Sequence, residues 1–467
     1  IIVRMNYNLS KKVSLLHKNQ KDFFDSQITL TNSFRIRKLK ELKKEIKIRE
    51  TEIHNALFKD MQKPTFEAMT SETVLVEKEV SLMIKMLPLW NRPHRKKSSL
   101  INFPSRDYLT PEPYGNTLMI SPWNYPFQLA ITPLIGSVAA GNTVVLKPSE
   151  YAPHTASVIK KIIENVFDPG HVYVMEGDAK IATELLKKRW DYIMFTGSTS
   201  VGKIVAKAAA IHLTPTTLEL GGKSPCIIDE SAPVSITAKR VVWGKFLNCG
   251  QTCIAPDYIL VHKKIKSNLI EALIREIEKS YGKNQKKSKD YGRIAHKMHF
   301  KNLKLAIKGE QIIYGGETDE KSLYFSPTLV EKPKKGSQLL KKEIFGPILP
   351  IIDYTEEKDI HEFLRVQERP LAFYVFSKKN KFINQLFKRY SFGGGVANDS
   401  IIQFANDKLP FGGIGSSGMG AYHGKYSFKN FSHEKPIIKR SFWFDLPGRY
   451  APYPKSLSLL KFLLKNL

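Results

Sequence analysis

Cys253 is the residue of this sequence whose setting is best suited to covalent chemistry, because it stands in a short polar turn between two apolar segments. The apolar spacing of residues 236–246 predicts a helix before it, and YILVH at 258–262 predicts a strand after it. A thiolate on such a loop can meet a substrate and act as a nucleophile. The alternative is a buried structural cysteine, since free cysteine is often buried. Cys249, four residues earlier, is a second thiol that competes for the role.

The segments around this turn belong to a long alternation of strands and helices. Between residues 114 and 220, the segments TLMIS, NTVVLKP, HVYVM and YIMFTG predict strands, and stretches with helical spacing follow them. Such alternation predicts a parallel sheet with helices on both faces. The pattern repeats between residues 221 and 425, which predicts a second α/β domain. A chain of 467 residues is long enough for two or three domains.

Two helices and a hairpin are expected before this alternation. Residues 31–62 carry apolar side chains on one stripe, which predicts one long amphipathic helix capped by Thr31 or Asn32. A coiled coil is the alternative, although the stripe does not continue over enough heptads. A second apolar helix is expected at about 66–90. Three prolines in residues 96–113 then predict an irregular hairpin between domains.

The formal net charge of +29 raises nucleic acid or an anionic membrane as a partner. The excess is diffuse, however, and no basic arm with interleaved aromatic residues stands out. We therefore expect no nucleic-acid partner. Three cysteines are too few for a disulfide framework, which favours a reducing, cytoplasmic compartment. Cys249 and Cys253 without nearby histidines offer too few ligands for zinc, so no metal is expected.

The C-terminal segment KSLSLLKFLLKNL is the one stretch with membrane character. Leu457, Leu460, Leu464 and Leu467 repeat at helical spacing, with lysines on other faces. Such a helix can lie on a membrane surface, but packing on its own domain or on a second subunit is favoured. No signal peptide is expected, and no stretch reaches the roughly 18 apolar residues that a membrane span requires.

Eight segments resemble, in the same order, motifs of the aldehyde dehydrogenase superfamily, and they run from about residue 30 to residue 435. They are SPWNYPFQLA at 121–130, VVLKPSE at 144–150, FTGSTSVGK at 195–203, TLELGGKSP at 217–225, GQTC at 250–253, EIFGP at 343–347, GGVAND around Asn398, and LPFGGIGSSGMGAYHGK at 409–425. The APDY after GQTC and the GMGAYHGKYSF segment look most like the class 3 branch, which includes fatty and aromatic aldehyde dehydrogenases.

This resemblance implies an α/β fold class: two doubly wound parallel-sheet domains with a small bridging sheet used in oligomerisation. Class 3 relatives are usually dimers, so a homodimer is expected. Some carry a C-terminal hydrophobic anchor. The implied organisation is a dinucleotide-binding domain at 5–95 and 114–220, a catalytic domain at 221–425, bridging elements at 96–113 and 426–445, and a C-terminal tail at 446–467.

The implied cofactor is NAD, with NADP also accepted. The loop GSTSVG does not fit the usual GxGxxG pattern, but it follows a predicted strand and opens a predicted helix, where N–H groups and the helix dipole favour a pyrophosphate. By resemblance, Gly197, Ser198 and Gly202 meet the cofactor. Lys147 binds the adenosine ribose with Glu150 nearby, and this carboxylate disfavours a 2′-phosphate.

Glu343 and Phe345 are implied to hold the nicotinamide ribose and to pack beside the nicotinamide. The alternative for Glu343 is a surface ion pair with the neighbouring lysines, which would stabilise little.

The implied chemistry is oxidation of an aldehyde to an acid through covalent catalysis by Cys253. Its thiolate attacks the carbonyl, and the Asn124 side chain and the Cys253 backbone N–H stabilise the oxyanion. After hydride transfer, water hydrolyses the thioester with Glu219 as base. Glu343 is a second candidate base. The alternatives are that Asn124 is an ordinary turn residue and that Glu219 is a structural carboxylate, for which Lys223 is a candidate partner.

We therefore expect NAD(P)-dependent oxidation of a medium- or long-chain aliphatic aldehyde, or of an aromatic aldehyde, in a cytoplasmic dimer. Tyr125 and Trp243 are candidates for the walls of the substrate tunnel. Two alternatives stay open. One is a non-catalytic basic scaffold or membrane-associated binding protein on the same fold, and the other is an acylating enzyme that passes the thioester to coenzyme A.

Overall fold

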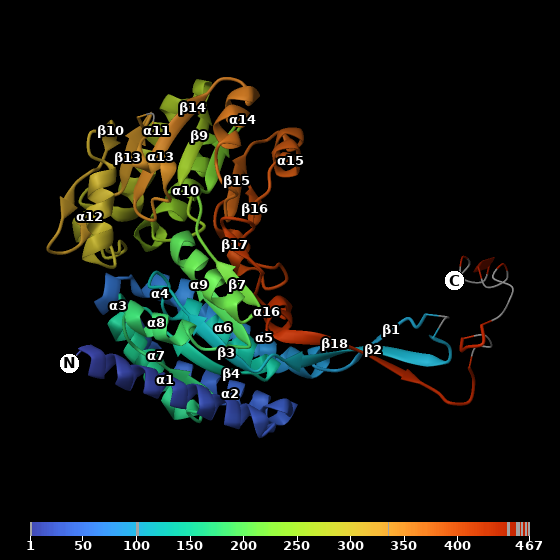
Figure 1. The fold of residues 1–467 in the computed structure, drawn as a ribbon. Coiled ribbons are helices and arrows are strands. Elements are labelled where there is room, and N and C mark those ends of the chain that lie inside the picture. Colours follow the sequence, from blue (N-terminus) through green and yellow to red (C-terminus); the bar gives the residue numbers. More distant parts are fainter. Residues whose placement is uncertain are drawn as a thin grey trace.

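The structure is a computed structural model of the chain. It describes residues 2–99, 102–334, 336–445 and 449–453, together with 458, 461, 462 and 465. Figure 1 shows two lobes and a thin arm that projects from the lower lobe. Each lobe is built on its own parallel sheet, and the arm is antiparallel.

The first sheet has six strands in the order β17-β7-β6-β3-β4-β5, and every neighbouring pair except β17 with β7 is parallel. The strands are β3 (Asn116–Ile120), β4 (Thr143–Lys147), β5 (Val172–Val174), β6 (Tyr192–Thr196), β7 (Thr216–Glu219) and β17 (Gly418–Met419).

Side chains that alternate along these strands fill two separate cores, one on each face of the sheet. Val144 faces a core shared with α2 (Asn32–Ile48), α5 (Val74–Trp90), α6 (Gln128–Ala140) and α7 (Pro153–Val166). Val145, the next residue, faces a core shared with α1 (Ile2–Asp25), α8 (Ala179–Leu186) and α9 (Thr199–Ile211). The sheet is therefore doubly wound, as expected.

The second sheet has seven strands in the order β10-β13-β14-β9-β8-β15-β16, and only the pair β10 and β13 is antiparallel. Its strands are β8 (Pro225–Ile228), β9 (Tyr258–His262), β10 (Ile312–Tyr314), β13 (Thr328–Glu331), β14 (Ile348–Tyr354), β15 (Ala372–Phe376) and β16 (Gly394–Ala397).

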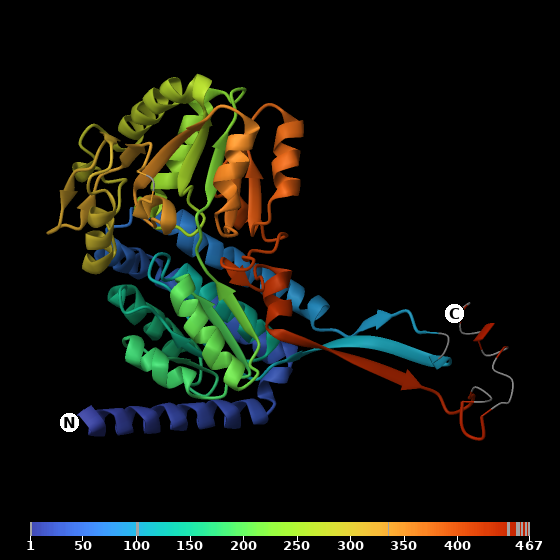
Figure 2. The ribbon, with the colours of Figure 1, turned by 45° about the horizontal axis from the view of Figure 1, so that its top comes forward.

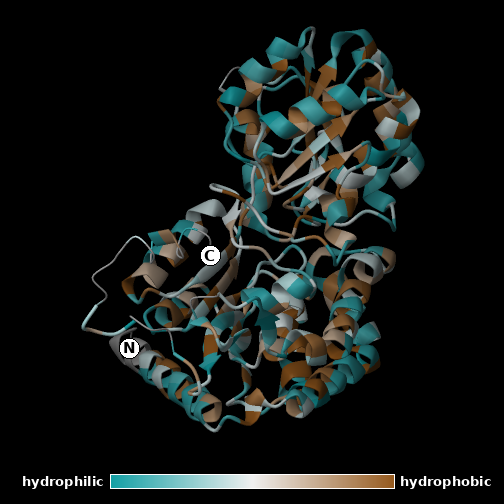
Figure 3. Ribbon diagram, turned by 90° about the vertical axis from the view of Figure 1, so that its right-hand side faces the viewer, coloured by the Kyte–Doolittle hydropathy of each residue, from teal (hydrophilic) through white to brown (hydrophobic). Residues whose placement is uncertain are grey.

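Helices cover both faces of this sheet as well. They are α10 (Val234–Phe246), α11 (Lys266–Tyr281), α12 (Lys297–Ala306), α13 (Gln338–Lys341), α14 (Glu357–Arg365) and α15 (Asn380–Arg389). Figure 3 shows both sheets as mainly hydrophobic and the surrounding helices as mixed, which is the pattern of strands buried on both faces.

The arm is a three-stranded antiparallel sheet of β1 (His94–Lys96), β2 (Ser105–Pro113) and β18 (Ser432–Arg440). Figure 2 shows it extending well beyond the lobes. β2 and β18 pair along their whole length, from Ser105 opposite Arg440 to Pro113 opposite Ser432. The small bridging sheet in the expected fold class is confirmed, and α16 (Lys425–Asn430) leads into it.

The N-terminal helices differ from the prediction. The single helix expected at 31–62 is two helices, α2 and α3 (Glu50–Met61), because Arg49 between them has non-helical angles (φ −99°, ψ 12°). Arg49 also bonds Glu45 at 2.5 Å and Glu52 at 2.7 Å, which bridges the break. Thr31 caps α2 as predicted, accepting the Phe34 N–H at 3.4 Å. Helix α1 was not predicted.

The second helix, expected at 66–90, is also interrupted. It consists of α4 (Thr65–Ala68), a π-helical turn at Met69–Thr73 and then α5. Within the part of the chain that is described, no helix is both long and apolar enough to cross a membrane. The four leucines of the expected C-terminal helix lie outside the described residues.

Candidate active site

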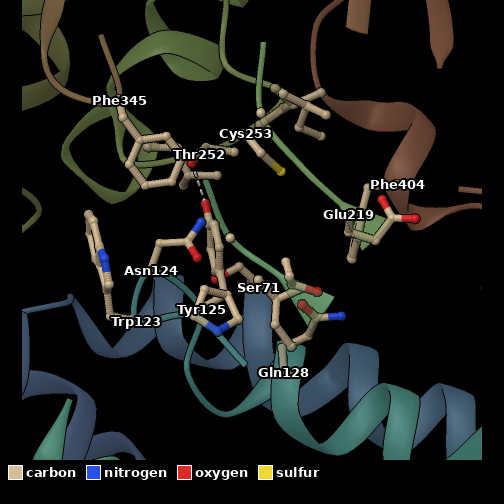
Figure 4. Close-up of a pocket in the computed structure, with 18 of the residues that line it drawn as sticks. Ser71, Trp123, Asn124, Tyr125, Gln128, Glu219, Thr252, Cys253, Phe345 and Phe404 are labelled. Carbon is tan, nitrogen blue, oxygen red and sulfur yellow. Dashed lines mark hydrogen bonds between the residues drawn. The ribbon is translucent and has the colours of Figure 1, made fainter. Parts of the chain in front are cut away.

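One large cavity, of about 1120 Å³, is lined by residues from both lobes. From the first lobe come the π-helical turn region, the loop before α6 and the start of α9. From the second come the loop after α10 and the loop after α13. Figure 4 shows this cavity, with the sulfur of Cys253 pointing into it and Asn124 and Glu219 on different sides. The predicted nucleophile, oxyanion donor and base thus line one cavity.

A tight turn between α10 and β9 positions Cys253. Asn248 and Cys249 both adopt left-handed backbone angles, with φ of 54° and 56°. Asparagine tolerates this conformation better than most residues. Cys253 is partly exposed to the cavity, whereas Cys249 is buried and donates its thiol hydrogen to the Tyr291 hydroxyl at 3.4 Å. The geometry therefore favours Cys253 over Cys249 as the nucleophile.

The surroundings of Cys253 disfavour its thiolate. Burial raises its pKa well above the usual range, and the charges of Glu343 and Glu219 raise it further, while backbone N–H groups of Cys253 and Ile254 lower it. Attack on a carbonyl therefore requires a base that removes the thiol proton. The same two glutamates are the carboxylates that line the cavity with the sulfur.

Asn124 is buried on the loop before α6 and lines the cavity. Its Nδ2 donates to the Gln251 carbonyl at 3.1 Å. Because an amide nitrogen carries two hydrogens, the second remains for an oxyanion. The Asn124 carbonyl accepts from Lys63 Nζ at 3.1 Å and from Asn248 Nδ2 at 2.8 Å. Hydrogen bonds thus hold both the side chain and the carbonyl of Asn124, which favours the predicted donor over an ordinary turn residue.

Glu219 is the last residue of β7, and both of its carboxylate oxygens are buried without a hydrogen-bond partner among the described residues. Burial raises its pKa well above the usual range. Its expected alternative as a partner of Lys223 is wrong, since Lys223 pairs with Asp257 and donates to two backbone carbonyls. A buried carboxylate without a partner at a cavity wall is typical of a functional group.

Glu343 lies on the loop after α13, where the backbone of the TLELGG segment passes directly beside it. Its pKa is raised to about 8, mainly by burial and also by the charge of Asp257, while the N–H of Gly222 acts in the opposite direction. A Cβ on Gly221 would lie 1.8 Å from Glu343 Oε2. The glycine therefore lets the chain pass Glu343. The alternative of a surface ion pair with the neighbouring lysines is wrong, because burial dominates the environment of this carboxylate.

The predicted cofactor residues fall into two groups. Gly197, Ser198, Glu343 and Phe345 line the cavity, while Lys147, Glu150 and Gly202 do not. Ser198 caps α9 by accepting the Val201 N–H at 3.4 Å, so the helix start opens on the cavity. Lys147 is buried at the end of β4 and pairs with Glu150 at 2.6 Å.

These features fit a dinucleotide. The start of α9 offers backbone N–H groups and a positive dipole end to a pyrophosphate. At Gly202 a Cβ would meet the Leu220 side chain at 2.5 Å, so the glycine lets α9 pack closely on the end of β7. The Lys147 and Glu150 pair offers a donor and an acceptor to ribose hydroxyls at the carboxyl edge of the sheet.

The two candidate substrate residues both line the cavity. Tyr125 is buried, and its hydroxyl bonds Thr252 Oγ1 at 2.7 Å. Trp243 projects from α10 and is 45% exposed. The apolar or aromatic lining residues that were not predicted include Phe66, Phe404 and Tyr422.

Polar lining groups that the motifs did not single out include the Tyr422 hydroxyl and the Glu67 carboxylate. The Tyr422 hydroxyl is buried without a partner among the described residues, although the GMGAYHGK motif pointed to its segment. Glu67 accepts the Asn248 N–H at 3.0 Å, and burial raises its pKa to about 7. No motif covers Glu67.

Comparison with known proteins agrees with this geometry. Residues 3–437 match the model of the aldehyde dehydrogenase family. The chain is similar to the 4,4'-diaponeurosporen-aldehyde dehydrogenase of Staphylococcus aureus, with 43% identity over 96% of this chain and 98% of the relative. It is also similar to the dimeric NADP-preferring aldehyde dehydrogenase of Canis lupus familiaris, with 41% identity over 94% and 98%.

Among solved structures, the chain is similar to the substrate-bound state of Staphylococcus aureus AldH. The TM-score is 0.94 at 41% identity, and the match covers 97% of this chain and 99% of that one. The expected fold class and the resemblance to the class 3 branch are thereby confirmed. The chain belongs to the aldehyde dehydrogenase family and is an NAD(P)-dependent aldehyde dehydrogenase.

Proposed function

We propose that Cys253 is the nucleophile of this dehydrogenase, that Asn124 is its oxyanion donor and that Glu219 is its deacylation base. The observation that carries the proposal is that all three side chains line one cavity, with the sulfur directed into it. Residues 5–95 and 114–220 are proposed to bind the dinucleotide, and residues 221–425 to carry the nucleophile.

The reaction begins when a carboxylate takes the proton of Cys253 and the sulfur attacks the aldehyde carbon. The carbonyl electrons move to oxygen, and this charge is held by the Asn124 amide and the Cys253 backbone N–H. When bound, the cofactor supplies the acceptor for the hydride that leaves the carbon. Gly197, Ser198, Lys147 and Glu150 hold its phosphate and adenosine ribose.

Loss of the hydride leaves a thioester on Cys253. Glu219 then accepts a proton from water as the water attacks the thioester carbon. The C–S bond breaks and the carboxylic acid leaves. The sulfur takes back the proton that the carboxylate removed in the first step, and Glu219 releases the water proton to solvent. Glu343 and Phe345 hold the nicotinamide side of the cofactor. Because the Glu219 oxygens have no hydrogen-bond partner in the part of the chain that is described, water is favoured over coenzyme A as the acyl acceptor.

The proposed substrates are apolar aldehydes, either medium- or long-chain aliphatic or aromatic. Phe404, Phe411 and Tyr125 line the cavity, and at its edge Phe66 and Trp243 are 70% and 45% exposed. Apolar side chains at the edge of the cavity favour the transfer of a hydrocarbon chain from water into the cavity. The name of the Staphylococcus relative gives a diaponeurosporen aldehyde as that enzyme's substrate, which agrees with an apolar tunnel.

The protein is further proposed to act as a cytoplasmic homodimer that prefers NAD over NADP. The name of the canine relative describes that enzyme as dimeric and NADP-preferring, which supports the dimer. The Glu150 carboxylate is expected to repel a 2′-phosphate, which favours NAD. The three cysteines are free, as is usual in a reducing compartment.

Replacing the nucleophile tests the proposed function. With NAD and a series of straight-chain and benzylic aldehydes, the wild-type chain is expected to produce NADH, followed by absorbance. Cys253→Ser is expected to lose at least about 1000-fold in kcat, because the residual rate without a nucleophile is small. The matched control, Cys249→Ser, removes a thiol of the same turn and is expected to remain active. Substantial activity in Cys253→Ser would contradict the assignment.

A further inference from the structure

Lys63 and Glu72 form an ion pair beneath the loop that carries Asn124, and both side chains are 0% exposed. Lys63 lies between α3 and α4, and Glu72 lies in the π-helical turn. A completely buried ion pair contributes little net stability, because desolvation offsets the attraction between the charges. The pair therefore calls for an explanation other than stability.

Both side chains also contact the loop between β3 and α6. Lys63 Nζ donates to the Asn124 carbonyl at 3.1 Å and lies 4.2 Å from the centre of the Tyr125 ring. Glu72 Oε2 accepts the N–H of Phe127 at 2.9 Å and of Gln128 at 3.2 Å. The carboxylate also complements the positive end of the α6 dipole. One ion pair thus holds the loop at its middle and at its junction with α6.

The π-helical turn makes this contact possible. Such a turn contains one more residue than a regular helical turn, so it changes which side chain faces a neighbouring element. Here Glu72 faces the start of α6. Turns of this kind occur often at functional sites.

Asn124 is held from the other side by the turn before Cys253. Asn248 Nδ2 donates to the Asn124 carbonyl at 2.8 Å, and Asn124 Nδ2 donates to Gln251 at 3.1 Å. If Lys63 were removed, one of the two bonds that fix the Asn124 carbonyl would be lost, and the peptide could rotate. Displacing a catalytic group by about 1 Å can cost up to about 100-fold in rate.

We propose that Lys63 and Glu72 are positioning residues that fix the Asn124 amide as oxyanion donor. This inference rests on the proposed function of Asn124. Neither residue touches the substrate in this role. Their effect on the rate passes entirely through the geometry of Asn124.

A triple variant tests whether the pair acts through Asn124. K63M/E72Q replaces both charges by neutral groups of similar size, so that no unpaired charge stays buried. Its kcat/KM is expected to fall about 30-fold, and that of N124A at least about 100-fold. K63M/E72Q/N124A is then expected to match N124A within about threefold, because the effects of coupled groups do not add. Fully multiplicative losses, or an unchanged K63M/E72Q, would overturn the proposal.

An exposed ion pair provides the matched control. K160M/E176Q removes Lys160 and Glu176, which are 3.0 Å apart and about 40% exposed, and kcat/KM is expected to stay within about twofold. Should K63M/E72Q not fold, as judged by thermal unfolding, K63Q/E72Q takes its place, since two amides can bond each other in the same space.

Alkylation of Cys253 by iodoacetamide separates positioning from general distortion. This reaction needs the thiolate but no oxyanion donor, so its rate in K63M/E72Q is expected to stay within about twofold of wild type. A fall as large as that in kcat/KM would show a general distortion and overturn the proposal. An inactive wild-type chain would instead contradict the proposed function itself.

Discussion

At the scale of single residues, the surroundings of Glu219 and Glu343 suggest different duties. Both line the cavity with Cys253. The Glu219 oxygens have no hydrogen-bond partner among the described residues, whereas Glu343 interacts with the Gly222 N–H and lies in the field of Lys223 and Lys245. A base that activates water needs free lone pairs. Glu219 meets this requirement better.

The two glutamine variants are expected to differ in pre-steady-state kinetics. In Glu219→Gln, NADH is expected to appear as a burst close to one equivalent per site, followed by turnover slowed by about 100-fold or more, because thioester hydrolysis lacks its base. In Glu343→Gln, the burst itself is expected to slow, and no thioester accumulates. Stopped-flow absorbance measures both phases. A burst with slow turnover in Glu343→Gln alone would reverse the assignment.

The pH dependence of the same step follows from the pKa of Glu219, which burial raises. A base acts only when ionised, so the hydrolysis rate of wild type is expected to rise with pH well above the range in which an ordinary glutamate titrates. Glu219→Gln serves as the control, and its hydrolysis rate is expected not to rise with pH over this range.

The sequence predicts the reacting residues but not their supports. Cys253, Asn124, Glu219 and Glu343 lie in recognisable motifs, and the structure brings all four to one cavity. Lys63 and Glu72 lie outside those motifs. Their link to Asn124 depends on a π-helical turn and on a contact across about 60 residues of chain. The spacing of apolar residues in the sequence predicts neither of these features.

At the scale of elements, the packing of α9 against β7 determines where the start of the helix lies. Gly202 is buried against Leu220, which directly follows Glu219. Gly202→Val is expected to force the helix away from β7, to cost about 1–3 kcal/mol of stability and to weaken NAD binding several-fold. Thermal unfolding and cofactor titration measure the two effects.

A second position of the same helix provides the control for this substitution. Ala210 is exposed near the end of α9. Ala210→Val therefore adds a branched side chain without a clash and is expected to cost only about 0.5 kcal/mol from helix propensity. Because Gly→Val itself gains helix propensity, equal losses from both variants would show that the contact with Leu220 does not explain the result.

The predictions of elements succeed where burial is strongest. The four strands predicted between residues 114 and 196, the strand predicted at 258–262 and helix α10 lie close to where apolar patterns predicted them. The single helix predicted at 31–62 is wrong at Arg49, where the helix breaks. The apolar side chains stay on one side across the break, so the spacing of apolar residues in the sequence does not reveal it. Helix α1 was missed because only a few of its side chains, such as Val13 and Leu16, are buried.

At the scale of the whole molecule, the arm stands out because it projects from the first lobe (Figures 1 and 2). Aromatic residues lie beyond the end of β18 and are exposed: Phe442 at 106% and Trp443 at 70%. Trp443 packs edge to face on Phe103 with ring centres 6.3 Å apart. Exposed apolar groups of this size usually mark a contact surface, and a second copy of the chain is the proposed partner.

This arrangement predicts a dimer that depends on the arm. In sedimentation equilibrium the wild type is expected at twice the 53.2 kDa of one chain. Phe442→Ser/Trp443→Ser is expected to raise the dimer dissociation constant at least about tenfold, because buried aromatic residues dominate interface energies. Val366→Ser is the control, since Val366 is 75% exposed at the end of α14, away from the arm. A monomeric wild type would contradict the dimer, whereas an unchanged dimer in the double variant would contradict only the role of these aromatic residues.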